Sequence, residues 1–332
     1  ELPTNLDDFT AFLQAAKGQY DIAPLTANKS CPFISTILTA FGMGDAEWYD
    51  IDGTYTHRIK HPQIADYLAY LQKLYSEGLM DNDMPINTAD NSKEKFASGN
   101  AIACAPLMFW DIPSMVNALS TSNPDCKIEF VTDLAPDADT QPHHYIMEGA
   151  KFVTCISQNS KNPEHVVNWL NILTEPDNFR RTYIGEEGVS YEIIDGEYHP
   201  IFEGDDATNF NAYTNSDKLS GFSDPTLAFQ MWQARARKTP EMAEAYEAMN
   251  SRVDEYEALV SIEAYGKTSP QVQEYITALN QAFSDSFLKA IVEGTDPDEA
   301  VAAMQAEWDA NGGLEVEAAM QEFYEANKDF AG

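Results

Sequence analysis

The feature that most constrains the fold is a repeated order of helix, short strand and aromatic-bearing loop, seen most clearly between Pro62 and Trp110. Apolar residues recur there every three or four positions and so share one helix face: Ile64, Leu68, Leu71 and Tyr75. Gly78 follows as a helix stop. The segment EKFASGNAIACAPLMFW then predicts a helix end, a glycine turn and a buried strand leading to Trp110 in a loop. Alternating helices and strands indicate an α/β fold.

The rest of the chain predicts further elements of the same kind. Helices are expected over residues 5–17, in PFISTILTAFGMG up to Gly42 and Gly44, and in NPEHVVNWLNIL. A hairpin is expected around Asp52–Gly53, and strands in CKIEFVTDLAPDAD and GAKFVTCIS. Beyond Phe229 the chain reads as helical, and strands are expected only before residue 200. One long apolar helix face precedes Gly294: Val272, Ile276, Leu279, Phe283, Phe287 and Ile291.

Composition limits the class of protein and of partner. With 332 residues the chain can form two domains of ~100–200 residues each. Its 44% hydrophobic content is typical of globular proteins, and no apolar run of ~18 residues predicts a membrane span. The 20 basic and 54 acidic side chains give a net charge of −34. This charge disfavours nucleic acids and anionic lipid surfaces as partners, because like charges repel.

The four cysteines predict neither a zinc ribbon nor a thioredoxin-like motif, because no two have CxxC spacing: Cys31, Cys104, Cys126 and Cys155. Cys104 and Cys155 lie in apolar, strand-like runs and are expected to be buried as small hydrophobic residues. The disulfide state stays open at this stage.

Several segments occur in the order found in one known family. They are LPTNLDDFTAFLQAAK, LQKLYSEGLMDNDM with FASGNAIA, SKNPEHVVNWLNILTEPDNF, and GEEGVSYEIIDGE. Together they cover most of residues 1–200 and resemble the extracellular solute-binding proteins of family 1, in particular the larger, lipoprotein-like branch. Proteins of that family deliver oligosaccharides to ABC transporters.

The resemblance implies a helix-rich, two-lobe α/β fold of the periplasmic-binding-protein-like type II class. Residues 1–140 would form an α/β segment of the second lobe, and 141–200 would return to the first. Residues 201–332 would be an acidic helical region packing mainly on the second lobe. Family members carry a stretch before the first motif that is not in this sequence, so much of the first lobe is expected to be missing.

The resemblance also implies a cellular setting and partners. The full-length protein would be extracellular and lipid-anchored to the outer face of the cell membrane. It would act as a monomer that binds an oligosaccharide and contacts ABC transporter permease subunits. No cofactor is expected.

Sugar recognition needs flat aromatic faces and polar hydroxyl partners, so aromatic residues in loops and at helix starts are the candidates. Six aromatic residues are predicted to contact ligand, with Glu148 as a hydroxyl acceptor: Phe33, Trp48, Tyr49, Trp110, Tyr145 and Trp232. Core packing is the alternative for each of the six. Trp169 and Trp308 lie in helical patterns and are expected to pack internally. Gly188 and Tyr191 are expected to form and pack a turn.

Neither a metal site nor a catalytic site is predicted. His57 and His61 are four residues apart, but Pro62 and the hairpin argue against a helix that presents both. DNDMP lacks the glycine and glutamate of an EF-hand loop. No nucleophile or dinucleotide motif is present. Two alternatives remain open: a glycan hydrolase or lyase whose carboxylate pair the sequence does not mark, and a non-catalytic protein-interaction domain.

Overall fold

The computed structural model describes residues 2–29, 32–105, 111–147, 154–201 and 231–330, apart from residues 235, 238, 253 and 255. The chain forms two compact units. Unit 1 consists of three segments: Glu1–Met108, Ser114–Gly149 and Arg252–Gly332. Unit 2 consists of two: Phe109–Pro113 and Ala150–Ser251. The predicted boundary at residue 140 falls inside unit 1 and the one at residue 200 inside unit 2, and the assignment of segments to lobes stays a prediction.

The N-terminal part of unit 1 follows its local sequence signals. Helix α1 (Leu6–Tyr20) begins at Asn5, whose side chain accepts the backbone N–H of Asp8 at 2.9 Å. Strand β1 (Leu25–Ala27) pairs in parallel with β4 (Ala103–Ala105). Helix α3 (Ile64–Ser76) buries most of its predicted apolar face. Shorter elements complete this part: α2 (Ser35–Leu38), η1 (Thr39–Phe41), η2 (Arg58–Lys60), α4 (Ala89–Ala97) and α5 (Ile112–Ser122).

The predicted hairpin is confirmed. Strands β2 (Trp48–Ile51) and β3 (Thr54–His57) are antiparallel, and the two residues between them have positive φ, 52° at Asp52 and 84° at Gly53. Two positive φ values are what a tight two-residue hairpin turn requires, and Asp-Gly accepts them at low cost.

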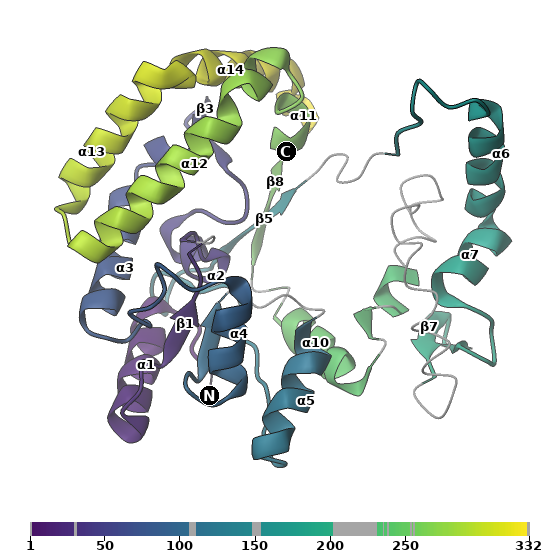
Figure 1. Ribbon diagram of the computed structural model, residues 1–332, viewed down its shortest axis with the longest axis horizontal. Coiled ribbons are helices and arrows are strands. Elements are labelled where there is room, and N and C mark those ends of the chain that lie inside the picture. Colours follow the sequence, from purple (N-terminus) through teal and green to yellow (C-terminus); the bar gives the residue numbers. More distant parts are fainter. Residues whose placement is uncertain are drawn as a thin grey trace. The chain divides into compact units, whose positions relative to one another are not determined.

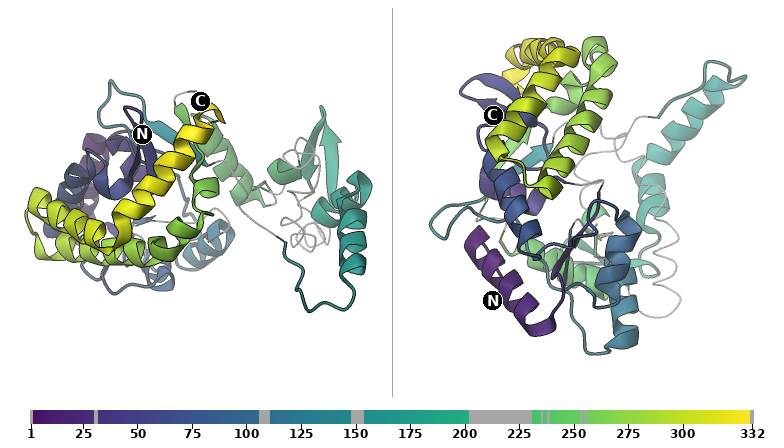
Figure 2. Two further views of the ribbon diagram at one scale, coloured as in Figure 1. Left: turned by 90° about the horizontal axis from the view of Figure 1, so that it is seen from above. Right: turned by 60° about the vertical axis from the view of Figure 1, so that its left-hand side comes forward.

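The C-terminal part of unit 1 is a layer of helices. It contains α11 (Glu263–Gly266), α12 (Pro270–Glu293), α13 (Pro297–Trp308), the kinked turn η6 (Asp309–Gly313), α14 (Leu314–Asn327) and η7 (Lys328–Phe330). Helix α12 packs against α3, α13 and α14, and α14 packs against β3 (Figures 1 and 2). The long apolar face is confirmed, since α12 buries Val272, Leu279, Phe283, Phe287 and Ile291 and ends at Gly294, which has φ +64°.

A strand pair was not anticipated in this part of the chain. Strand β8 (Glu257–Ser261) pairs in parallel with β5 (His143–Met147), so the expectation that strands end before residue 200 is wrong. Residues 126–139 form no strand, and neither do the described residues 154–157 of the other predicted strand. Cys155 is exposed rather than buried, Cys104 is half-buried, and Cys126 and Cys155 are free thiols.

Unit 2 has its own apolar core. Its described elements are α6 (Pro163–Thr174), α7 (Pro176–Ile184), the antiparallel pair β6 (Tyr191–Ile194) and β7 (Glu197–Pro200), and α10 (Pro240–Asn250). The core contains Phe179, Tyr183, Ile184, Tyr191, Tyr198, Met231 and Ala234. Tyr191 packs there as predicted, beside Gly188, whose φ is positive. Trp169 on α6 is 57% exposed, so the expectation of internal packing is wrong for this residue.

Candidate functional site

Three of the predicted ligand-binding aromatic residues lie close to the turn between η1 and β2, in unit 1. Tyr145 on β5 meets Tyr49 on β2 edge-to-face, with ring centroids 4.9 Å apart. The Tyr145 hydroxyl donates to the carbonyl of Gly42 at 3.3 Å. Gly44 makes this approach possible, since a Cβ at that position would lie 3.0 Å from the Tyr145 ring. Tyr145 is half-buried, whereas Tyr49 is fully buried.

Arg58 connects this turn to the third residue, Phe33. The Arg58 guanidinium is buried, and its Nη2 donates to the carbonyls of Gly44, at 2.9 Å, and Ala46. Its Cζ lies 4.8 Å from the centre of the Phe33 ring, in cation–π geometry. The same ring packs against Phe283 of α12, with centroids 5.1 Å apart. Arg58 therefore holds the turn and the aromatic residues together. We call Phe33, Gly44, Tyr49, Arg58 and Tyr145 the aromatic cluster.

Trp48 lies in strand β2 rather than in an exposed loop, which corrects the sequence-based placement. It is 1% exposed, stacks on Tyr55 with centroids 5.7 Å apart, and meets the edge of His57 at 5.1 Å. Strand pairing turns this indole into the core, so Trp48 presents no face to solvent in this structure. Trp48 and the neighbouring Tyr49 are both packed in the core, and their contact with a ligand stays a prediction.

The other predicted site residues lie elsewhere. Trp232 belongs to unit 2, is 50% exposed, and approaches Tyr246 with ring centroids 6.3 Å apart. Trp110 and Glu148 lie outside the described residues. The structure thus brings Phe33, Tyr49 and Tyr145 into one cluster.

The sequence reasoning missed Arg58 and the space made at Gly44. An arginine beside two histidines and a glycine in GMG were the available signals. Neither signal indicates which aromatic ring these residues will contact.

A buried acid–base network lies at the start of β2. One Glu263 oxygen, Oε2, accepts the backbone N–H groups of Glu47 at 2.7 Å and Trp48 at 2.9 Å. Its other oxygen, Oε1, lies 2.7 Å from the Lys267 ammonium, which also reaches Glu47 at 2.7 Å. Burial alone would raise the pKa of Glu47, but Lys267, together with Arg58, lowers it below its ordinary value. Both carboxylates are therefore engaged in holding the fold.

The two histidines of the His57–His61 pair are neutral imidazoles. Burial lowers the pKa of His57 to about 3, and burial together with Arg58 lowers that of His61 to about 4. His57 stacks on Trp308 with centroids 4.2 Å apart, and Nδ1 accepts the N–H of Ile59 at 3.2 Å. Across the described ranges, no three histidine, cysteine or acidic side chains are placed to share a metal ion.

Comparison with known proteins gives the fold. No family model matches the chain. It is 29% identical over 270 residues to an uncharacterised protein in the butB 5′ region of Niallia circulans, which covers 79% of this chain and all of that protein.

Solved structures align with nearly the whole chain. They include a Streptococcus pneumoniae ABC-transporter substrate-binding protein, FusA, in complex with fructo-nystose, at TM-score 0.65 and 15% identity, and alginate-binding protein AlgQ2, at 0.64 and 16%. A third is an HMO-binding solute-binding protein of Bifidobacterium longum infantis, at 0.58 and 18%. The alignments cover 98–99% of this chain and 68–70% of those chains.

The chain has a periplasmic-binding-protein-like α/β fold. The fold predicted from the sequence is thereby confirmed. The helix-rich chain with its short strand pairs is consistent with this fold. None of the described helices is long and apolar enough to cross a membrane.

Proposed function

We propose that this chain is the solute-binding component of an ABC importer of the family 1 type and that it captures an oligosaccharide between two lobes. Ligand contacts to both lobes would favour hinge closure, and the closed form would deliver the sugar to membrane permease subunits. The observation that carries the proposal is the fold. The structural similarity to an alginate-binding protein, an HMO-binding protein and a substrate-binding protein in complex with fructo-nystose extends over 98–99% of this chain.

The aromatic cluster supports a sugar as the ligand. Phe33 and Tyr145 are only half-buried and rest on a rigid base formed by Arg58 and the Gly44 turn. Aromatic rings on a rigid base can stack against the apolar face of a pyranose without losing much conformational freedom. Tyr145 also lies on β5, the last described strand before the chain leaves unit 1 for residues 150–251.

A binding role without chemistry fits the state of the buried ionisable groups. Glu263 and Glu47 are held by backbone N–H groups and Lys267, and His57 and His61 are packed as neutral rings. A general acid or base needs a proton-transfer partner in reach of the substrate. Because these four groups are engaged in holding the fold, their state favours the importer over a glycan hydrolase or lyase.

The proposed setting follows from the same function. We place the protein outside the cell, lipid-anchored in its full-length form, acting as a monomer beside permease subunits. A net charge of −34 suits a soluble carrier of neutral sugars, since it keeps copies apart.

The test is a thermal-shift screen against plant and host oligosaccharides. Each glycan is then recovered, and mass spectrometry establishes whether it is unchanged. At a hundredfold excess over Kd, binding should add ~2.7 kcal/mol of stability. Trp110→Ala and Trp232→Ala should reduce the shift. Trp169→Ala is the matched control, because Trp169 is an exposed tryptophan of unit 2 that is not predicted to touch ligand.

Two results would overturn the proposal. If no glycan produces a thermal shift, an oligosaccharide is not the ligand, and peptides are the next class to screen. Consumption of a glycan would indicate an enzyme.

A further inference from the structure

Strand β5 carries two neighbouring side chains that are held on opposite faces. Because side chains alternate along a strand, His144 and Tyr145 point away from each other. Tyr145 rests on the turn at Gly42 and Gly44, within the aromatic cluster. His144 faces Asp133, with 2.5 Å between its Nδ1 and a carboxylate oxygen of that residue. The strand is therefore held against unit 1 from both faces.

The backbone beside Asp133 is itself anchored. The adjacent Leu134 is fully buried, and its carbonyl accepts the Thr39 hydroxyl at 3.0 Å. Thr39 is the first residue of η1, which leads into the turn that holds Tyr145. These contacts form a closed ring around β5, and the His144–Asp133 pair is the one link in that ring that depends on charge.

Strand β5 depends on side-chain contacts because its pairing is limited. In the described part of the chain it pairs with β8 and with no other strand. Strand β8 follows the return of the chain to unit 1 at Arg252, whose Nη1 donates to the Thr132 hydroxyl at 2.6 Å. Both strands of the pair are thus tied to the same short segment, residues 132–134, which fixes how they lie on unit 1.

The groups around the His144 ring come from three parts of unit 1. Asp133 shares its hydrogen bond, Asp45 adds a second negative charge, and the Tyr256 ring lies 6.1 Å away between centroids. The Arg252 Cζ lies 5.6 Å from the centre of the same Tyr256 ring. The hydrogen bond to Asp133 is the largest influence and raises the pKa of His144 above its ordinary value. His144 is therefore a cation below the raised pKa and becomes neutral as the pH rises through it.

We propose that His144 is a positioning residue for the oligosaccharide site and makes sugar binding depend on pH. The protonated ring holds β5 on Asp133, so that Tyr145 stays on the Gly44 turn with its ring ready to stack on a sugar. When His144 loses its proton the ion pair is lost, and the strand gains freedom that must be given up again when the sugar binds. The inference rests on the proposed function, because Tyr145 must contact the ligand.

Proton linkage makes the proposal measurable. If the protein binds sugar more tightly with His144 protonated, it must bind that proton more tightly with sugar present, by the same factor. Sugar binding near the pKa of His144 should therefore take up protons from the buffer. His57 and His61 do not contribute between pH 5.5 and pH 8.5, because burial lowers their pKa values to about 3 and about 4.

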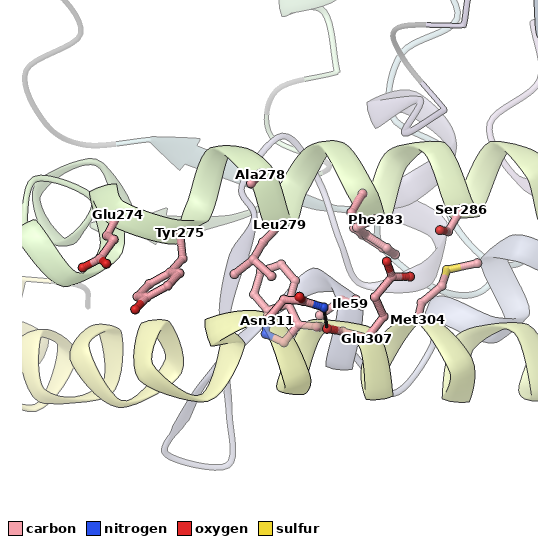
Figure 3. Close-up of a pocket in the computed structure, with 12 residues that line it drawn as sticks. Ile59, Glu274, Tyr275, Ala278, Leu279, Phe283, Ser286, Met304, Glu307 and Asn311 are labelled. Carbon is pink, nitrogen blue, oxygen red and sulfur yellow. Dashed lines mark hydrogen bonds between the residues drawn. The ribbon is translucent and has the colours of Figure 1, made fainter.

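Isothermal titration at pH 5.5 and pH 8.5 tests the proposal, with nystose and with every other glycan that gives a thermal shift. The parent should bind about fivefold more weakly at pH 8.5. Asp133→Asn and His144→Gln should each bind equally at both pH values, near the affinity of the parent at pH 8.5. Two exposed residues provide controls that should keep the pH dependence of the parent. They are His165→Gln on α6, and Glu307→Gln at the edge of the cavity between α12 and α13 (Figure 3).

The Tyr145 ring gives a second readout, which needs no sugar. With ¹³C-labelled tyrosine rings, the NMR signal that Tyr145→Phe removes should shift with pH at the midpoint of the His144 titration. The shift should be absent in Asp133→Asn, and thermal unfolding establishes that each variant is folded.

The outcomes separate this inference from the proposed function. Equally tight sugar binding by the parent at both pH values, or a Tyr145 signal that does not follow His144, would overturn the positioning role and leave the importer proposal intact. If no glycan binds at either pH, both proposals fail.

Discussion

At the scale of single residues, three histidines respond to their surroundings in opposite directions. Burial lowers the pKa of His57 to about 3 and that of His61 to about 4. The hydrogen bond to Asp133, 2.5 Å from Nδ1, raises the pKa of His144, which is half-exposed on β5. An unfolded histidine titrates near 6.5. Below that pH both histidines are protonated in the unfolded chain but stay neutral in the folded protein. Acidification therefore destabilises unit 1 through these two residues.

The pH dependence can be tested by removing one histidine at a time. When the pH falls from 7 to 5.5, His57 should lower the unfolding free energy of the unsubstituted protein by about 1 kcal/mol, because its pKa in the folded state lies far below 6.5. His57→Phe should lose less stability over this interval. Urea titrations followed by tryptophan fluorescence at the two pH values measure the difference.

His144→Gln provides the contrast, because its pKa shift has the opposite sign. The stability that protonated His144 contributes is present below pH 6.5 and is lost as the pH rises through its raised pKa. Removing it should therefore weaken the protein more at pH 5.5 than at pH 8. Equal pH slopes for the parent and both variants would contradict this account of the histidines.

At the scale of elements, one buried carboxylate joins the hairpin to the C-terminal helices. Glu263, at the start of α11, accepts both N–H groups at the beginning of β2 and pairs with Lys267 one helical turn later. A second Lys–Glu pair of the same spacing, Lys289–Glu293, lies exposed on α12 at 3.9 Å. The two pairs share the i,i+4 spacing, with the order of Glu and Lys reversed, and lie in opposite environments.

Replacing each glutamate by alanine should separate these environments. Glu263→Ala leaves the backbone N–H groups of Glu47 and Trp48 without their acceptor and Lys267 with Glu47 alone, and should destabilise unit 1 by about 3–5 kcal/mol. Glu293→Ala removes a solvent-exposed pair, worth about 0–1 kcal/mol. Chemical denaturation of both variants makes the comparison. A similar small loss in both would mean that Glu263 does not hold the hairpin.

At the scale of the whole molecule, the balance of charge is the dominant electrostatic property. The chain carries 54 acidic and 20 basic side chains. Several lysines are shared between two acids, as Lys60, Lys95 and Lys267 are. These contacts relieve local repulsion, but the excess of acids remains spread over the surface and favours expanded states.

Salt should therefore stabilise the protein. Raising NaCl from 0.02 M to 0.5 M shortens the screening length well below 10 Å and weakens surface repulsion. Each kcal/mol gained should raise Tm by about 2–4 °C. Differential scanning calorimetry across the series measures the change, with choline chloride as a control for specific cation binding. A falling Tm would mean that the lysine-mediated pairs outweigh the repulsion.

The success of the sequence-based predictions depended on how local each signal was. The Asp52–Gly53 hairpin, the α12 face and the stop at Gly294 were predicted correctly, because turn chemistry and helical period act within a few residues. Strand β8 was missed, since its partner β5 lies more than a hundred residues away in the sequence. Trp169 and Trp308 share a helical pattern, yet α6 buries none of its residues while α13 buries Trp308.

The sequence by itself determined the α/β class and the main helices, because periodicity and composition are properties of the chain. Only the tertiary structure decided which rings meet. It placed Trp48 in the core, brought Phe33 onto the Arg58 guanidinium, and brought Tyr145 onto the turn at Gly42 and Gly44. Those outcomes depend on contacts between distant segments, where packing and burial rather than local preference set the position of each side chain.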